Sequence, residues 1–271
     1  MDQYRVEATP PHLILPPDDE LRRIPIPLWS PSNCIVCSGT RAFMWWNADR
    51  SKPVEWECDC EDQFVLGVYL LSRGLLMKQM RTGWADLVGL PPQGVQWCQT
   101  YLAKAEAFAK RGIGAVLMGD SGVGKSTLAH LMLRTLMAAG MDGYWVTYPS
   151  LVQLVKDGWT DKETNSWFDR RVRNAPVLVV DQLGKEHSSQ PFAASLLDDV
   201  LRHRLSSMMP TFITTNLREP ELQQRYGAAV VEVIHEASSL CVINGESWRA
   251  AESGRAQAEA EMGLTRPIVM G

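Results

Sequence analysis

The sequence predicts an α/β fold in which a parallel sheet is flanked by helices, with a smaller domain before it. Three observations predict this fold. Apolar strands alternate with helical patterns from residue 115 onward, a glycine-rich motif joins the first of these strands to a helix, and two cysteine pairs lie near the N-terminus. The 271 residues can bury a sizeable core and leave room for one α/β domain and a small module.

The glycine-rich motif matches the pattern G-x-x-x-x-G-K-[ST] at every fixed position, which identifies it as a P-loop. An apolar strand at 115–118 precedes it, and a helix with apolar spacing at 128–133 follows it. The backbone N–H groups of such a loop, together with the helix N-terminus, form a cradle for phosphate. We expect Lys125 to reach the β- and γ-phosphates and the Ser126 hydroxyl to coordinate a phosphate-bound Mg²⁺. The predicted nucleotide-binding residues are Gly119, Asp120, Ser121, Gly122, Val123, Gly124, Lys125, Ser126 and Thr127.

Further strands are predicted at 143–147, 177–181 and 211–215. The second of them ends in Asp181, as a buried parallel strand does when it delivers a carboxylate to the phosphate edge of a sheet. We interpret it as Walker B, in which Asp181 holds Mg²⁺ through water or through Ser126. The third ends in Asn216, a polar amide at the same predicted edge.

Two close cysteine pairs, Cys34 with Cys37 and Cys58 with Cys60, supply the four thiolates that a tetrahedral Zn²⁺ site needs. The residues between them predict two short strands, as in the hairpin of a zinc ribbon. Such a closed site is structural and favours an interaction module. The alternative is that these are four unrelated thiols. Cys98 and Cys241 have no neighbouring cysteine and are interpreted as buried thiols.

The net charge of −4 and the pI near 5.8 argue against a surface coated with positive charge for nonspecific duplex binding. The N-terminus lacks the pattern of a signal peptide, and the apolar stretch 64–77 is interrupted by Arg73. We therefore expect a cytoplasmic protein with no membrane partner.

From Tyr101 to Arg249 the sequence resembles the AAA+ helicase loaders of the DnaC and DnaI type and the related transposition helper ATPases of the IstB type. The resemblance rests on the P-loop, on the segments "VLVVDQLG", "PTFITTNL" and "INGESWR", and on the helix that ends at Arg204. DnaI-like loaders carry an N-terminal zinc-binding domain and IstB-like proteins lack one, so the cysteines favour the loader branch.

The resemblance implies ATP as the nucleotide and assigns further roles. It makes Lys125 and Asp181 catalytic through phosphate and Mg²⁺, Asn216 the first sensor of the γ-phosphate and Arg249 a candidate second sensor. Gln182 departs from the family, which has an Asp or Glu there to activate water. Because an amide can position water but cannot accept its proton, we expect weak ATPase activity.

The arginine that acts on the ATP of a neighbouring subunit is also missing. Related loaders place arginines a few residues after Gly227, where this chain has 228-AAVVEV-233. Arg225 and Arg204 are the available substitutes, and either could instead be structural. Three arginines at 170, 171 and 173, beside Trp167 and Phe168, could bind single-stranded DNA, although a solvated helix end is the simpler interpretation.

These observations predict a replicative helicase loader. Its zinc module is expected to bind the hexameric helicase, and its ATPase domain to form oligomers and to engage single-stranded DNA. Two alternatives are an IstB-like transposition helper that acts on duplex DNA and a non-hydrolysing scaffold that depends on nucleotide. The predicted domains are a proline-rich arm (1–33), a zinc ribbon (34–63), a helical linker (64–100), the AAA+ ATPase domain (101–250) and a tail (251–271).

Overall fold

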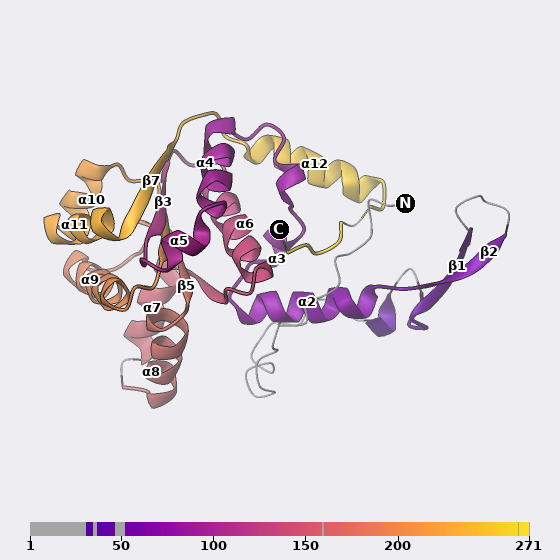
Figure 1. Cartoon of the computed structure of the whole chain (residues 1–271), viewed down its shortest axis with the longest axis horizontal. Helices are drawn as coiled ribbons and strands as arrows, with labels where there is room; N and C mark the ends of the chain where they lie inside the picture. The colour runs from indigo at the N-terminus through magenta and orange to yellow at the C-terminus, as the bar shows by residue number, and fades with distance from the viewer. Residues whose placement is uncertain (1–30, 35–36, 47–51, 159, 265, 271) are drawn as a thin grey trace. The chain divides into compact units, whose positions relative to one another are not determined.

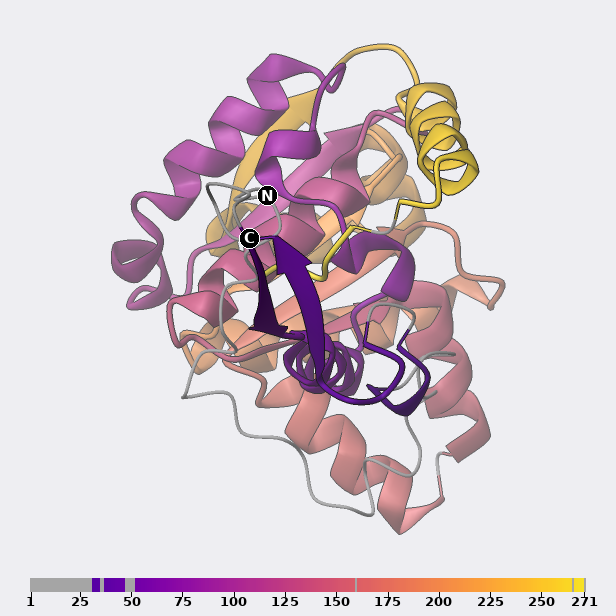
Figure 2. The same ribbon diagram turned by 90° about the vertical axis from the view of Figure 1, so that its right-hand side faces the viewer.

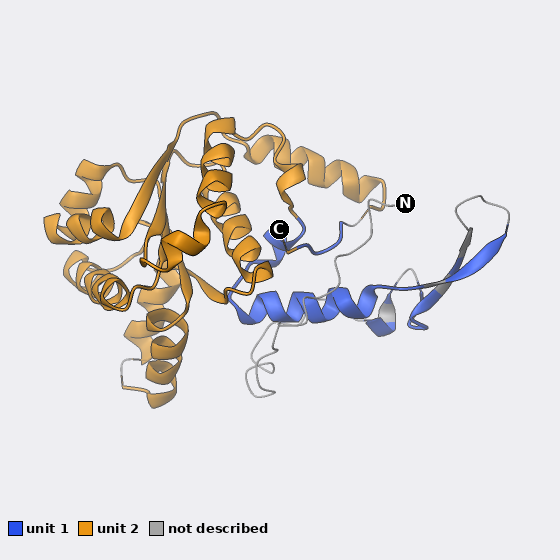
Figure 3. Ribbon diagram, viewed as in Figure 1, with its two compact units in different colours: residues 1–81, 266–269 blue, residues 82–265, 270–271 orange. Residues whose placement is uncertain are grey.

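The computed structural model describes residues 31–34, 37–46, 52–158, 160–264 and 266–270. It divides into two compact units, which Figure 3 shows in different colours: residues 1–81 with 266–269, and residues 82–265 with 270–271. Most of the predicted proline-rich arm lies outside the described residues. The predicted helical linker is divided between the two units.

The first unit contains an antiparallel hairpin, as predicted between the cysteine pairs. Its strands pair in a register that runs from Ala42 opposite Glu57 to Trp46 opposite Pro53, and Figure 2 shows them in front of the helix that follows. A segment near the C-terminus joins this unit, because Gln63 bonds both the N–H and the carbonyl of Ile268, at 2.6 and 3.2 Å. The elements are η2 (Pro31–Asn33), β1 (Ala42–Trp46), β2 (Pro53–Glu57), α2 (Cys60–Ser72) and α3 (Met77–Met80).

The second unit is built on a five-stranded parallel sheet with strand order β4-β5-β6-β3-β7. The predicted strands are confirmed, and β7 is the apolar strand that contains Cys241. The elements are η3 (Trp84–Asp86), α4 (Pro92–Leu102), α5 (Ala105–Ala109), β3 (Gly114–Gly119), α6 (Lys125–Ala138), β4 (Gly143–Thr147), α7 (Tyr148–Gly158), α8 (Lys162–Phe168), η4 (Asp169–Arg173), β5 (Val177–Leu183), α9 (Gln190–Ser206), β6 (Thr211–Thr215), α10 (Glu219–Tyr226), α11 (Ala228–Ala237), β7 (Ser238–Ile243) and α12 (Arg249–Glu261).

Helices cover both faces of this sheet, because its strands are apolar on both sides. Ile213 of β6 belongs to a core shared with α7, α9 and α11. Its neighbour Phe212 points to the opposite face, where it packs edge-on against Tyr101 of α4, with ring centroids 5.4 Å apart. Figure 1 shows α9, α10 and α11 on one side of the sheet and α4 and α6 on the other. The parallel arrangement brings the carboxyl ends of all five strands to one edge, where the predicted site residues follow.

No helix in the described part of the chain is long and apolar enough to cross a lipid bilayer.

Candidate nucleotide-binding site

The P-loop runs from the end of β3 to the start of α6, as predicted, and its conformation requires glycine. Gly119, Gly122 and Gly124 have φ angles of 151°, 92° and 90°. A Cβ on Gly119 would lie 2.1 Å from the carbonyl oxygen of Ile243, and one on Gly124 would lie 2.0 Å from Cδ2 of Leu90. The loop is therefore packed against β7 and against the segment before α4, two contacts that no local sequence pattern reveals. This glycine cradle fits a bound phosphate chain.

Lys125 points back into the loop. It is 7% exposed, and its Nζ donates hydrogen bonds to the carbonyl oxygens of Gly119 at 2.7 Å and Asp120 at 2.6 Å. Burial lowers the pKa of Lys125 to about 8, and the positive charge of nearby Lys185 contributes to the decrease. An anion bound in the loop would stabilise the charged ammonium group.

The P-loop and the end of β5 are joined by a hydrogen bond from Ser126 Oγ to Asp181 Oδ1 of 2.7 Å. Thr214 on β6 donates to the same oxygen at 2.5 Å, a partner that sequence reasoning missed. Asp181 is fully buried, and its other carboxylate oxygen has no hydrogen-bond partner among the described residues. Burial raises the pKa of Asp181, although both hydroxyls oppose this shift. A hydroxyl beside a buried carboxylate with an available oxygen fits the donor set for Mg²⁺.

Gln182 sits on an irregularity at the end of β5, where the pairing with β6 shifts register between Val180 and Leu183. Its φ of 62° is rare for a residue with a side chain, and its N–H donates to Thr214 Oγ1 at 3.0 Å. The side chain is exposed next to the buried Asp181. The unusual backbone conformation thus occurs together with an exposed Gln182 side chain at the position predicted to orient water.

Asn216 and Arg249 also lie at this edge of the sheet. Asn216 directly follows β6, whose last residue is level with the end of β3. Arg249 opens α12, and the residue before it, Trp248, donates its N–H to the carbonyl of Gly122 in the P-loop at 2.9 Å. Both residues follow strands that adjoin the P-loop strand, in positions compatible with their predicted sensor roles.

Arg204 is wrong as a substitute for an arginine that acts on a neighbouring subunit. Its side chain is fully buried, so it is unavailable to another chain. The guanidinium instead joins α9 to the segment before β5 and to the start of β6, which satisfies several backbone groups at once. Its acceptors are the carbonyl oxygens of Val172, Arg173, Ala175 and Pro210 and the hydroxyl of Thr211.

Arg225, the other candidate, forms an ion pair within the chain. Its Nε lies 2.8 Å from a carboxylate oxygen of Glu186, whose side chain is 1% exposed. A role on a neighbouring subunit would require this pair to open, so that role stays a prediction.

A family model described as the IstB-like ATP binding protein matches residues 97–256, which is more than half of the chain. The chain belongs to the IstB-like ATP-binding family. The match covers the P-loop, the end of β5 and the start of α12, the elements that form the site just described.

This IstB-like protein is also similar to helicase loaders, as the sequence resemblance predicted. The replicative helicase loader DnaI of Bacillus subtilis strain 168 is 28% identical over 116 residues, which are 43% of this chain and 37% of DnaI. The replicative helicase loader DnaC of Escherichia coli K12 is 25% identical over 160 residues, which are 57% of this chain and 65% of DnaC. The chain thus spans less than two thirds of the length of either relative.

Solved structures agree with the fold. A crystal structure of the DnaC helicase loader superposes with a TM-score of 0.55 and 25% identity, covering 62% of this chain and all of that one. A crystal structure of DnaI has a TM-score of 0.56 at 23% identity and covers 63% of this chain and 95% of that one. The predicted AAA+ fold of the second unit is therefore confirmed.

The first unit of this IstB-like protein brings the four predicted zinc ligands together. The Sγ atoms of Cys34 and Cys58 are 3.8 Å apart, as are those of Cys37 and Cys60, and all four lie within 4.8 Å of one another. A tetrahedron of sulfurs about 2.3 Å from Zn²⁺ has edges of about 3.8 Å, whereas a disulfide needs about 2.05 Å. The cluster thus fits Zn²⁺.

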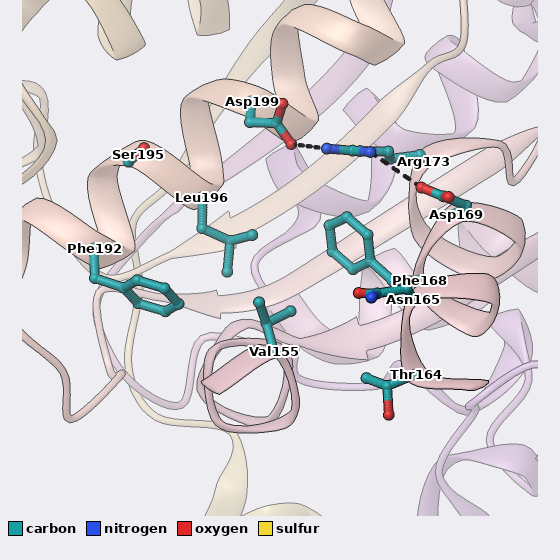
Figure 4. Close-up of a pocket in the computed structure, with 10 residues that line it drawn as sticks. All are labelled: Val155, Thr164, Asn165, Phe168, Asp169, Arg173, Phe192, Ser195, Leu196 and Asp199. Carbon is teal, nitrogen blue, oxygen red and sulfur yellow. Dashed lines mark hydrogen bonds and ion pairs between the residues drawn. The ribbon is translucent and has the colours of Figure 1, made fainter. Parts of the chain in front are cut away.

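A cavity of about 570 Å³ lies between α7, α8, η4 and α9 (Figure 4). None of the predicted nucleotide-binding residues lines it. On its wall Arg173 donates to Asp169 at 3.1 Å and to Asp199 at 2.5 Å. Because two carboxylates already hold this guanidinium, the structure favours a solvated helix end over DNA contact at Arg173.

Proposed function

We propose that this protein is an ATP-dependent loader of the replicative DNA helicase. One observation carries the proposal: a P-loop ATP site occurs in the same chain as a four-cysteine cluster that belongs to a separate compact unit. A domain that responds to nucleotide, joined to an interaction module stabilised by a metal ion, suits a protein that binds a partner and alters the partner's conformation when ATP binds. The similarity to the loaders DnaC and DnaI supports this choice of partner.

Within the ATP site each group has a distinct role. Lys125 would exchange its two loop carbonyls for phosphate oxygens, and Ser126 and Asp181 would hold Mg²⁺, which neutralises charge between the phosphates. Asn216 would sense the γ-phosphate and Gln182 would orient water. Without a carboxylate at position 182, proton removal from that water is weak, so ATP binding is the main signal.

The zinc module would bind the hexameric helicase, while the AAA+ units assemble with one another on ATP and admit single-stranded DNA. Native mass spectrometry with the host's replicative helicase, with and without ATP and Mg²⁺, tests this proposal. A discrete complex on the helicase hexamer is expected, and the variant Cys34→Ser plus Cys58→Ser should weaken it. Cys241→Ala, which removes a buried thiol from the other unit, is the matched control.

A transposition helper is the second candidate function, because the matching family model is named after IstB. Such a protein would bind duplex DNA and stimulate a transposase. Failure to bind the helicase under every nucleotide condition, together with ATP-dependent binding to duplex DNA, would favour it. ATP binding without any effect of nucleotide on assembly or on helicase activity would favour a scaffold.

A further inference from the structure

Basic residues follow four of the five parallel strands at the edge that holds the P-loop. Lys125 follows β3, Lys185 follows β5, Arg218 follows β6 and Arg249 follows β7. These strands are adjacent, in the order β5-β6-β3-β7. Lys185 and Arg249 are close enough to Lys125 for their positive charges to lower its pKa. Four positive charges from four separate segments therefore lie at the edge that holds the P-loop. Only two of these residues, Lys125 and Arg249, have predicted roles.

Arg218, which lies between β6 and α10, forms an ion pair with a residue of the P-loop. Its Nη2 lies 3.9 Å from Oδ1 of Asp120, the first variable residue of the loop. The backbone carbonyl of the same Asp120 accepts a hydrogen bond from Lys125. Asp120 is thus hydrogen-bonded by one cation, Lys125, and faces a second, Arg218, at ion-pair distance. Both cations could exchange these oxygens for phosphate oxygens.

The ion pair between Arg218 and Asp120 is easily exchanged. The side chains are 53% and 73% exposed, so water screens their attraction. A triphosphate carries several negative charges and offers a guanidinium the bidentate acceptors that it prefers. A nucleotide in the loop would also repel the Asp120 carboxylate, which removes the competing partner.

Two other arginines that could neutralise the terminal phosphate are occupied, and Arg249 is already assigned as the candidate second sensor. Arg204 is fully buried, and Arg225 is paired with Glu186. Helix α11, which lies where related proteins place an arginine for the neighbouring subunit, contains neither Arg nor Lys. Arg218 is therefore the exposed arginine at this edge that has no role assigned so far.

We propose that Arg218 binds the terminal phosphate of the ATP held by its own chain, in place of an arginine from a neighbouring subunit. This inference rests on the proposed ATP binding and adds a residue to that site. Because ADP lacks the terminal phosphate, Arg218 would discriminate ATP from ADP.

The test compares the affinities of fluorescent ADP and a fluorescent non-hydrolysable ATP analogue for three variants, measured by titration with Mg²⁺. Arg218→Ala should weaken binding of the analogue about tenfold, the loss expected for one charged hydrogen bond, and leave ADP within about twofold. Arg218→Lys should retain part of the preference for the ATP analogue over ADP, because lysine keeps the positive charge but lacks the paired N–H donors of the guanidinium. Arg202→Ala is the matched control, since Arg202 is 54% exposed and pairs with Asp198 on α9.

Equal weakening of both nucleotides by Arg218→Ala, or no change in either, would overturn the inference and leave ATP binding intact. If the wild-type protein bound neither nucleotide, the proposed function and this inference would fall together. The wild-type titrations therefore separate the two failures.

Discussion

Arg225 is tied to Glu186 by two contacts, one from Nε to the carboxylate at 2.8 Å and one from Nη2 to the backbone carbonyl at 3.0 Å. The same carboxylate accepts hydrogen bonds from the Tyr226 hydroxyl at 2.7 Å and from the N–H of Gly184 at 3.1 Å. This pair fastens the loop after Asp181 to α10, the helix that follows Asn216. It thereby links the predicted metal ligand to the predicted phosphate sensor.

Removal of Arg225 should destabilise the protein. In Arg225→Ala the Glu186 carboxylate stays buried without its cation, which should lower the free energy of unfolding by about 2–4 kcal/mol. Adding Glu186→Gln should restore part of this loss, because the unpaired charge disappears. Urea unfolding measures both effects. The exposed ion pair of Arg202 with Asp198 serves as the control, because its loss should change stability little. An Arg225→Ala variant as stable as Arg202→Ala would contradict the stabilising role of the pair between Arg225 and Glu186.

Gln182→Glu should increase ATP hydrolysis. The substitution keeps the side-chain length and the unusual backbone conformation while supplying a base for water, so we expect about a hundredfold higher rate at saturating ATP. A steady-state phosphate-release assay measures it, with Gln182→Ala as the control that supplies no base. A rate in Gln182→Glu as low as in the wild type would show that Gln182 does not limit hydrolysis.

The cysteine cluster should bind one Zn²⁺ per chain. Cys34→Ser plus Cys58→Ser removes two of four ligands, and metal analysis of the purified protein should show the loss of zinc. Cys241→Ala should keep its zinc, since Cys241 lies in β7 outside the cluster. Wild-type protein that contains no zinc after purification in zinc-supplemented buffer would argue for four unrelated thiols.

His130 should make stability depend on pH. It is fully buried on α6 against Trp145, and its pKa is lowered well below the usual value by burial and by the charge of Arg134. Below about pH 6.5 the unfolded chain binds a proton at this histidine that the folded chain does not. The free energy of unfolding should therefore fall by up to about 1.4 kcal/mol per pH unit as the pH decreases.

Urea unfolding at pH 7.5 and 5.5 tests this prediction. His130→Gln should reduce the difference between the two pH values, whereas the exposed His187→Gln should not. A wild-type protein equally stable at both pH values would contradict the prediction.

The sequence predicted those parts of the protein that leave local signals. The P-loop motif and the apolar strand before Asp181 each occupy a few consecutive residues, so their patterns can be read without the fold. Thr214 could not be assigned a role in this way, because its contact with Asp181 depends on the pairing of β5 with β6. The sequence showed the strand but not its neighbours.

The roles of the arginines were harder to predict because the residue type alone does not reveal burial. Arg204 and Arg225 looked equally available in the sequence, yet one is fully buried and the other is held by Glu186. Arg218 is a single basic residue in a polar segment, where no motif indicates a role. Its place beside Asp120 follows from the adjacency of β6 and β3, which are far apart in the chain.

The position of β3 inside the sheet has a consequence for biosynthesis. Both of its neighbours, β6 and β7, come later in the chain, so the ribosome releases the P-loop segment well before the strands that flank it. Until β7 emerges, nothing supplies the Ile243 carbonyl against which Gly119 turns. A nascent chain therefore carries the P-loop motif before the loop can adopt its phosphate-binding conformation, and it acquires affinity for ATP only after β7 has emerged.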